Sequence, residues 1–351
     1  MYRRPLLQRL DPPSVVVFRA LQLGDMLCAV PALRALRNAL PRARIALVGL
    51  PWAQQFARRY AAYIDEFIPF PGHPLLPEQA VHQESLADFY THMCARRFGL
   101  ALQLHGNGNV SNDIVSGFGA EAMAGFCSGE PVVRERTVLF PYPDTDAEPE
   151  RLLHLMQRLG AEDAGLQLEF PLTRQDEDEL AASGLRHGLD GDYICIHPGA
   201  RHRDKCWPPR HFAQVADCLA SEFGLQIVLT GSAQEADLTA EVAAHMRTPR
   251  PAIDAAAPVS IGAMAALMRD ARLLLCNDTG VSHIAAGLQL KSVVIFSKAD
   301  IARWAPLDRH THRCIWDPAG ERVATVLDHA RALLSGTAPS RQRTVGMWPY
   351  W

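Results

Sequence analysis

The stretch Leu273-Leu274-Leu275-Cys276-Asn277-Asp278-Thr279-Gly280-Val281-Ser282-His283 decides the fold of the second half of this chain. Its first four residues form a short apolar run, which is typical of a parallel strand covered on both faces. Asp278 or Thr279 can cap a following helix, and Gly280 lets backbone approach a ligand closely. Free N–H groups at a helix start favour phosphate. An ordinary capped turn shows the same Asp-Thr-Gly pattern, so the surrounding chain has to decide between the two.

The surrounding sequence alternates between strand and helix patterns. The predicted strands are 193–197, 226–230, 273–276 and 292–296, and the predicted helices are 211–223, 235–246, 259–268 and 323–334. Regular alternation of this kind predicts a doubly wound parallel sheet.

The first half of the chain shows the same rhythm. Ser14–Phe18 is a β-branched strand, and a helical pattern starts at Asp25 and contains Pro31, which either kinks it or marks its first turn. Further strands are predicted at 44–49 and 101–105. Two α/β halves that face each other across a cleft form the GT-B arrangement, so we predict that fold.

We place the domain boundary near residue 175. The predicted domains are 1–175 and 176–325, and both are Rossmann-like. Residues 326–351 hold a helix end and a tail, which we expect to pack back on the first domain.

Composition excludes several classes of protein. The chain has 351 residues, 48% of them hydrophobic, and a net charge of −3, which gives no reason to expect nucleic acid. Apolar runs are far shorter than the roughly 20 residues that cross a bilayer. The eight cysteines contain no C-x-x-C pair, and the N-terminus has no signal-peptide pattern. We therefore expect a cytoplasmic protein.

Four candidate ligand-binding places follow predicted strands of the second half. They are His197–Pro208, Gly231–Ser232 with Glu235, Asp278–Gly280 with His283, and Ser297–Trp304. Carboxyl ends of parallel strands meet at one edge of a sheet, where glycines and helix starts bind phosphates. Lys205 adds a positive charge, unless it is a solvated surface lysine, and Glu235 can accept ribose hydroxyls.

In the first half one carboxylate is a candidate for catalysis. Asp25 follows Gly24 at the first strand–helix turn, where it can act as a general base on a hydroxyl, as a helix cap, or as both. Arg19, His105 and Asn107 follow first-half strands and are the acceptor-side candidates.

No metal site is predicted. Asp144-Thr145-Asp146 matches a D-x-D metal pattern, but it lies in a proline-rich stretch with no predicted strand before it, so we interpret it as a solvated acidic linker. The fourteen histidines show no paired ligand spacing.

Three motifs together resemble one known family. They are Phe18–Leu27 with Pro31-Ala32-Leu33, His197–Ala200 followed by Lys205–Pro209, and Asn277–Ala286. In order and spacing they are similar to the ADP-heptose:lipopolysaccharide heptosyltransferases, glycosyltransferase family 9, over residues 14–310.

The resemblance implies a GT-B fold and an inverting, metal-independent transfer of heptose from ADP-heptose to a lipopolysaccharide core, with no cofactor. It makes 1–175 the acceptor-side domain and 176–325 the domain that binds the nucleotide-sugar donor. By position, Asp25 would be the base, Lys205 would neutralise the diphosphate, and Glu235 would hold the ribose. The other implied donor-binding residues are Gly199, Ala200, Gly231, Asp278, Thr279, Gly280 and His283.

The chain also departs from the family pattern. Leu21 and Gln22 replace small hydroxyl residues of some members, and the loop 201–204 is unusually charged. Three alternatives therefore stay open: a protein O-heptosyltransferase, an epimerase or hydrolase that acts on a nucleotide sugar, and a non-catalytic carbohydrate-binding relative.

A lipid-anchored acceptor would bring the protein to the inner face of the inner membrane, with transient contact only. The candidate surfaces are the excursion 71–92 and the aromatic tail 347–351. For the tail we favour packing on the N-terminal domain over membrane contact.

Overall fold

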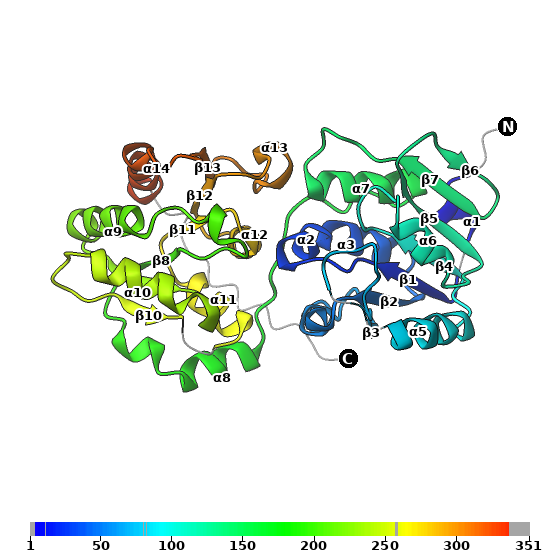
Figure 1. Ribbon diagram of the computed structural model, residues 1–351, viewed down its shortest axis with the longest axis horizontal. Helices are drawn as coiled ribbons and strands as arrows, with labels where there is room; N and C mark the ends of the chain where they lie inside the picture. Colours follow the sequence, from blue (N-terminus) through cyan, green and yellow to red (C-terminus); the bar gives the residue numbers. More distant parts are fainter. Residues whose placement is uncertain (1–3, 11, 80, 82, 257–258, 337–351) are drawn as a thin grey trace.

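The computed structural model describes residues 4–10, 12–79, 81, 83–256 and 259–336. Figure 1 shows two α/β halves side by side, with the N-terminal half in blue to green on the right. Helices α2 (Leu23–Cys28) and α12 (Gly280–Gly287) meet at the junction. The tail 337–351 lies outside the described residues, so its predicted packing stays a prediction, as does the domain boundary near residue 175.

The first half is built on a sheet with strand order β3-β2-β1-β4-β5-β7-β6, parallel except for the β6–β7 pair. The strands are β1 (Ser14–Phe18), β2 (Arg44–Gly49), β3 (Glu66–Pro69), β4 (Leu100–Gln103), β5 (Ala122–Cys127), β6 (Val132–Val133) and β7 (Thr137–Pro141). Alternate residues of β1 pack on opposite faces, Val15 and Val17 in one core and Val16 and Phe18 in another. Helices therefore cover both faces, as the unbroken apolar run predicted.

The helices of this half are α1 (Leu6–Arg9), α2, α3 (Val30–Ala39), α4 (Gln54–Arg59), α5 (Gln83–Ala95), α6 (Ser111–Ser116) and α7 (Glu148–Leu159), with a 3-10 turn at Pro51–Ala53. The single helix that could start at Asp25 is divided into α2 and α3 at Ala29, and Pro31 lies in the first turn of α3. Proline fits there because the first N–H groups of a helix have no intrahelical partner.

The second half has the strand order β10-β9-β8-β11-β12-β13, with all pairs parallel. The strands are β8 (Tyr193–His197), β9 (Gln226–Thr230), β10 (Ile253–Ala255), β11 (Leu274–Asn277), β12 (Ser292–Phe296) and β13 (His312–Trp316). The helices are α8 (Arg174–Ala182), α9 (Pro209–Phe223), α10 (Ala236–His245), α11 (Ile261–Arg269), α12, α13 (Ile301–Trp304) and α14 (Val323–Ser335), with 3-10 turns at Leu185–Gly188, Arg203–Lys205 and Ala233–Glu235. This is the doubly wound order that the sequence predicted.

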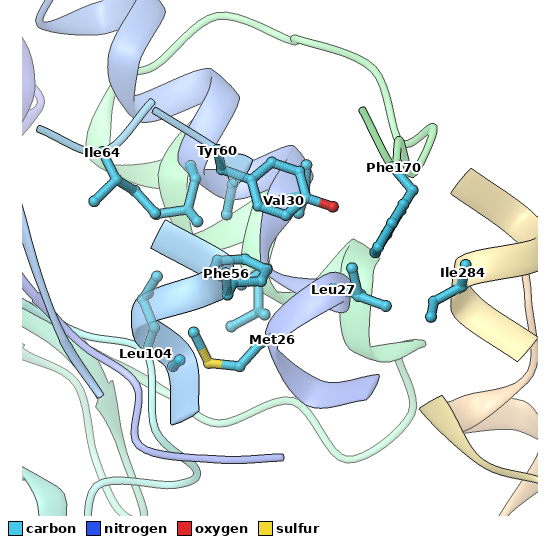
Figure 2. Packing of buried hydrophobic residues seen from close by; sticks show 14 of the residues in the cluster. Met26, Leu27, Val30, Phe56, Tyr60, Ile64, Leu104, Phe170 and Ile284 are labelled. Carbon is cyan, nitrogen blue, oxygen red and sulfur yellow. The ribbon is translucent and has the colours of Figure 1, made fainter. Parts of the chain in front are cut away.

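The two halves share one hydrophobic core at their junction. Leu27 of α2 and Phe170 of the connecting segment lie beside Ile284 of α12 (Figure 2). These three side chains are at most 5% exposed. The contact holds the carboxyl edges of the two sheets close to each other. None of the described helices is long and apolar enough to span a membrane.

Candidate active site

A cavity of about 470 Å³ lies where the two halves meet. Both sheets reverse their strand order beside the first strand of their half, between β1 and β4 and between β8 and β11. Ligands bind outside the carboxyl ends of strands at such points. The cavity is lined by Gln22, Leu23, Gly24, Asp25, Arg201, His202, Lys205, Asp278, Thr279, Gly280, Val281, His283, Ala299 and Trp304.

Asp25 reaches this cavity from the first turn of α2. The N-cap position belongs to Gln22, so the interpretation of Asp25 as a helix cap is wrong. Burial raises the pKa of the Asp25 carboxyl and nearby Glu148 raises it further, while Arg19 and Arg303 act in the opposite direction. A half-buried carboxylate with a raised pKa is suited to accept a proton near neutral pH.

Two of the three acceptor-side candidates, Arg19 and His105, are buried and form hydrogen bonds within the first half of the chain. The guanidinium of Arg19 is buried and donates to the backbone carbonyl of Asp25 at 2.8 and 3.0 Å. His105 Nδ1 accepts from the Ala20 N–H at 3.2 Å, and burial lowers the His105 pKa to about 4, which keeps the ring neutral. Neither side chain is among those that line the cavity, and their acceptor role stays a prediction. Asn107 is exposed, and its acceptor role stays a prediction.

The turn after β11 has the predicted strand–turn–helix form. Thr279 occupies the N-cap position with extended backbone but makes no side-chain cap hydrogen bond, so the expected capping by Asp278 or Thr279 is absent. The backbone N–H groups at the start of α12 are therefore not occupied by a cap side chain. They adjoin the cavity at Gly280 and Val281, where a phosphate would be favoured.

Lys205 lies opposite this turn. Its Nζ is 3.4 Å from Asp278 Oδ2, and burial raises the Asp278 pKa although the Lys205 charge lowers it. The Lys205 backbone carbonyl accepts a hydrogen bond from Ser297 Oγ at 3.1 Å. Lys205 is thus oriented toward the cavity rather than toward bulk solvent, which excludes the surface-lysine interpretation.

Asn277 fixes the segment between β8 and α9 that carries Lys205, a role that the sequence analysis missed. Its Nδ2 donates to the Pro198 carbonyl at 2.7 Å, and its Oδ1 accepts from the Trp207 N–H at 2.9 Å. The side chain is fully buried. A polar residue that ends an otherwise apolar strand was the available signal.

A second cluster of predicted residues lies at the ends of β8 and β9. Glu235 Oε2 accepts from the Ser232 backbone N–H at 2.8 Å and from its Oγ at 2.7 Å. A Cβ on Gly199 would come within 2.0 Å of Glu235 Oε1, so any other residue there would displace the Glu235 carboxylate. Gly231 and Ala200 are buried beside them. Glu235 ends a 3-10 turn before α10, so the predicted helix 235–246 starts one residue later.

His283 of α12 lines the cavity beside the contact between α2 and α12. Burial lowers its pKa to about 4, so the imidazole is neutral, and both ring nitrogens lie within 3.9 Å of Cys28 Sγ. A Cβ on Gly24 would lie 3.2 Å from His283 Cδ2, and one on Gly280 would lie 3.0 Å from the Gly24 nitrogen. The two glycines therefore let α2 and α12 touch through their backbones.

The cavity also contains residues that the sequence analysis placed in candidate stretches without naming them one by one. Arg201 and His202 belong to the stretch His197–Pro208, and Trp304 of α13 ends the stretch Ser297–Trp304. The first two add basic groups to the wall that holds Lys205, which favours an anionic ligand.

The D-x-D motif lies between β7 and α7. Contrary to the sequence argument, a strand, β7, ends at Pro141 shortly before it, and α7 begins at Glu148. Asp144 is exposed, and Asp146 Oδ2 lies 3.3 Å from His154 Nδ1. Within the described part of the chain, no group of three or more His, Cys, Asp or Glu side chains is placed to hold a metal ion.

Two doubly wound sheets with a polar cleft at their facing edges define a GT-B protein. The family model of glycosyltransferase family 9 (heptosyltransferase) matches residues 134–325, and the chain belongs to this family. It is therefore a glycosyltransferase, as the three motifs indicated.

Individual relatives agree with this assignment. Lipopolysaccharide heptosyltransferase 3 of Escherichia coli is 32% identical over 121 residues, and this match covers 34% of the chain but only 35% of that protein's length. Lipopolysaccharide heptosyltransferase 2 of Salmonella typhimurium is 25% identical over 326 residues, 86% of the chain and 87% of the relative. The solved E. coli ADP-heptose lps heptosyltransferase II has a TM-score of 0.70 at 22% identity, with 92% of this chain and 98% of that one covered, and shows the shared fold.

Proposed function

We propose that this glycosyltransferase transfers a heptose from ADP-heptose to a lipopolysaccharide core acceptor, with inversion and without a metal ion. The relatives are lipopolysaccharide heptosyltransferases 2 and 3, which supports the sugar and the acceptor class. The donor-side residues implied by the resemblance support ADP-heptose.

The observation that carries the proposal is that Asp25 of one half and Lys205 with the Gly280 turn of the other line the same cavity. An inverting transfer needs a base on one side of the anomeric carbon and a stabilised leaving group on the other. The two halves supply these two poles. Because both poles belong to preformed turns, little reorganisation is needed at the moment of reaction.

The reaction follows from this arrangement. Asp25 takes the proton of an acceptor hydroxyl, and the oxygen attacks the anomeric carbon as its bond to the diphosphate breaks. The departing ADP gains negative charge, which Lys205 and the first N–H groups of α12 stabilise. Neutral His283 contributes shape rather than charge.

A lipid-anchored acceptor would require the cavity to reach a membrane surface. Leu75, with 69% of its surface exposed, lies in the excursion before α5 and is the most exposed large apolar residue in the described part of the chain. We propose transient binding, which vesicle co-sedimentation with and without Leu75→Ser tests; equal binding of both proteins would exclude this residue.

The test of the function is ADP release from ADP-heptose with truncated lipopolysaccharide cores, and NMR of the product to determine the anomeric configuration. Asp25→Asn should lower kcat by about 10²-fold or more, because a general base typically contributes that much. Asp328→Asn, an exposed carboxylate on α14, is the matched control. Release of ADP without any acceptor would favour a hydrolase, and near-normal turnover by Asp25→Asn would remove Asp25 from the mechanism.

A further inference from the structure

A buried carboxylate behind Asp25 joins the two halves of the protein. Glu148 lies at the start of α7. Its Oε1 accepts a hydrogen bond from Arg19 Nη2 at 3.0 Å, and its Oε2 accepts one from Arg151 Nη1 at 2.8 Å. Glu148 Oε2 also accepts hydrogen bonds from Arg303 Nε at 3.1 Å and from Arg303 Nη2 at 3.0 Å. Glu148, Arg19 and Arg151 belong to the first half, whereas Arg303 comes from α13 of the second half. One carboxylate thus binds three guanidinium groups across the junction.

Helix α13 connects this ion cluster to the cavity. Trp304 and Ala299 line the cavity, while the neighbouring Arg303 points to the cluster. The Arg303 guanidinium lies 4.6 Å from the centre of the Trp304 ring and donates to Tyr142 Oη at 2.7 Å. A ligand that contacts Trp304 therefore contacts the helical turn that carries Arg303.

Arg19 connects the cluster to Asp25. Its guanidinium donates to Glu148, to the Asp25 backbone carbonyl and to the Leu104 carbonyl, so all its directions are fixed. A planar guanidinium holds several acceptors in one rigid geometry. The first turn of α2, and with it the Asp25 side chain, is thereby set by the position of Glu148.

We propose that Arg303 and Glu148 are positioning residues of the transferase: Arg303 contacts Glu148 across the junction, Glu148 orients Arg19, and Arg19 holds Asp25 in its catalytic position. The inference rests on the proposed function to the extent that Asp25 is the base. It links the position of the donor-binding second half to the position of the base in the first half.

The charges around Asp25 make the proposal testable by pH. Asp25 is faced by Arg19 after β1, Glu148 of α7, Arg303 of α13, Asp278 after β11, and Cys28 on its own helix. Arg303 lowers the Asp25 pKa and Glu148 raises it. Arg303→Met should therefore move the acidic limb of kcat/KM to higher pH, and Glu148→Gln should move it to lower pH. Shifts of opposite sign would show that both charges act on Asp25, and the accompanying fall in kcat would show that the two residues also position it.

The decisive kinetic variant is Arg303→Met, because the Arg303 side chain is one-third exposed and its loss leaves the core packed. We expect kcat to fall about 10-fold or more, since small misplacements of a catalytic group have large effects, and KM for ADP-heptose to change much less. Arg303→Lys keeps the charge and should restore the pH profile and part of kcat.

The matched control is Arg59→Met. Arg59 of α4 binds Asp176 of α8 at 2.7 and 2.9 Å, so it also joins distant segments of the chain but lies away from Asp25. It should lower the melting temperature without moving the pH profile. Unchanged kcat and pH profile in Arg303→Met, with an active wild type, would overturn the proposal.

Failure of the proposed function would look different, because wild type would then transfer no sugar or Asp25→Asn would remain active. A double-mutant cycle of Arg303→Met and Glu148→Gln by thermal unfolding needs no activity. We expect strongly non-additive changes in melting temperature, as for residues in contact. Additive changes would overturn the contact itself.

Discussion

Mild acid should destabilise this protein through its buried neutral histidines. Burial lowers the pKa of His105, His283 and His312 to about 4 each. In the unfolded chain their pKa is about 6.5, so between these two values the unfolded state binds more protons than the folded state. The free energy of unfolding therefore keeps its full value above pH 6.5 and decreases as the pH falls toward 4. Between pH 7 and pH 5, linkage gives a loss of about 2 kcal/mol for each histidine.

The assay is urea unfolding of wild type and His105→Asn at pH 7 and pH 5. Asparagine Oδ1 can take over the hydrogen bond that His105 Nδ1 accepts from the Ala20 N–H, so the variant removes mainly the titration. Asp25 and Asp278, whose raised pKa acts in the opposite direction, are the same in both proteins and cancel in the comparison. We expect the variant to lose about 2 kcal/mol less than wild type. Equal losses would refute the inference that His105 is buried and neutral.

Three further predictions concern the cleft. Lys205→Ala and Glu235→Ala should weaken ADP binding in calorimetry by about 10- to 100-fold, the value of one hydrogen bond to a charged group; unchanged affinity in both would contradict the donor assignment. Transfer should persist in EDTA, because Lys205 and the α12 N–H groups carry the leaving-group charge; loss that Mg²⁺ reverses would point to a metal. Gly280→Ala should separate α2 from α12 and cost about 1–3 kcal/mol in thermal unfolding, whereas Gly129→Ala, with open space around it, should be neutral; equal effects would argue against the close contact.

The sequence by itself determined the architecture and the two poles of the cleft. Unbroken apolar runs such as Val15–Val17 and Leu273–Cys276 can only be satisfied by strands buried on both faces, and such strands require a doubly wound sheet. Residues that directly follow these strands must then gather at the carboxyl edges. For this reason Asp25, Lys205, Asp278, Thr279, Gly280 and His283 line one cavity, as predicted.

Only the tertiary structure decided which polar residues face the cleft and which support it. Arg19 directly follows β1 and His105 closely follows β4, but both are buried, because a residue after a strand can turn toward either the ligand or the core. Glu148 was given no role from the sequence, yet its carboxylate binds Arg19 and Arg303, which are separated from it by 129 and 155 positions along the chain. Such contacts depend on how α7, α2 and α13 pack against one another, and no local pattern of the sequence encodes that packing.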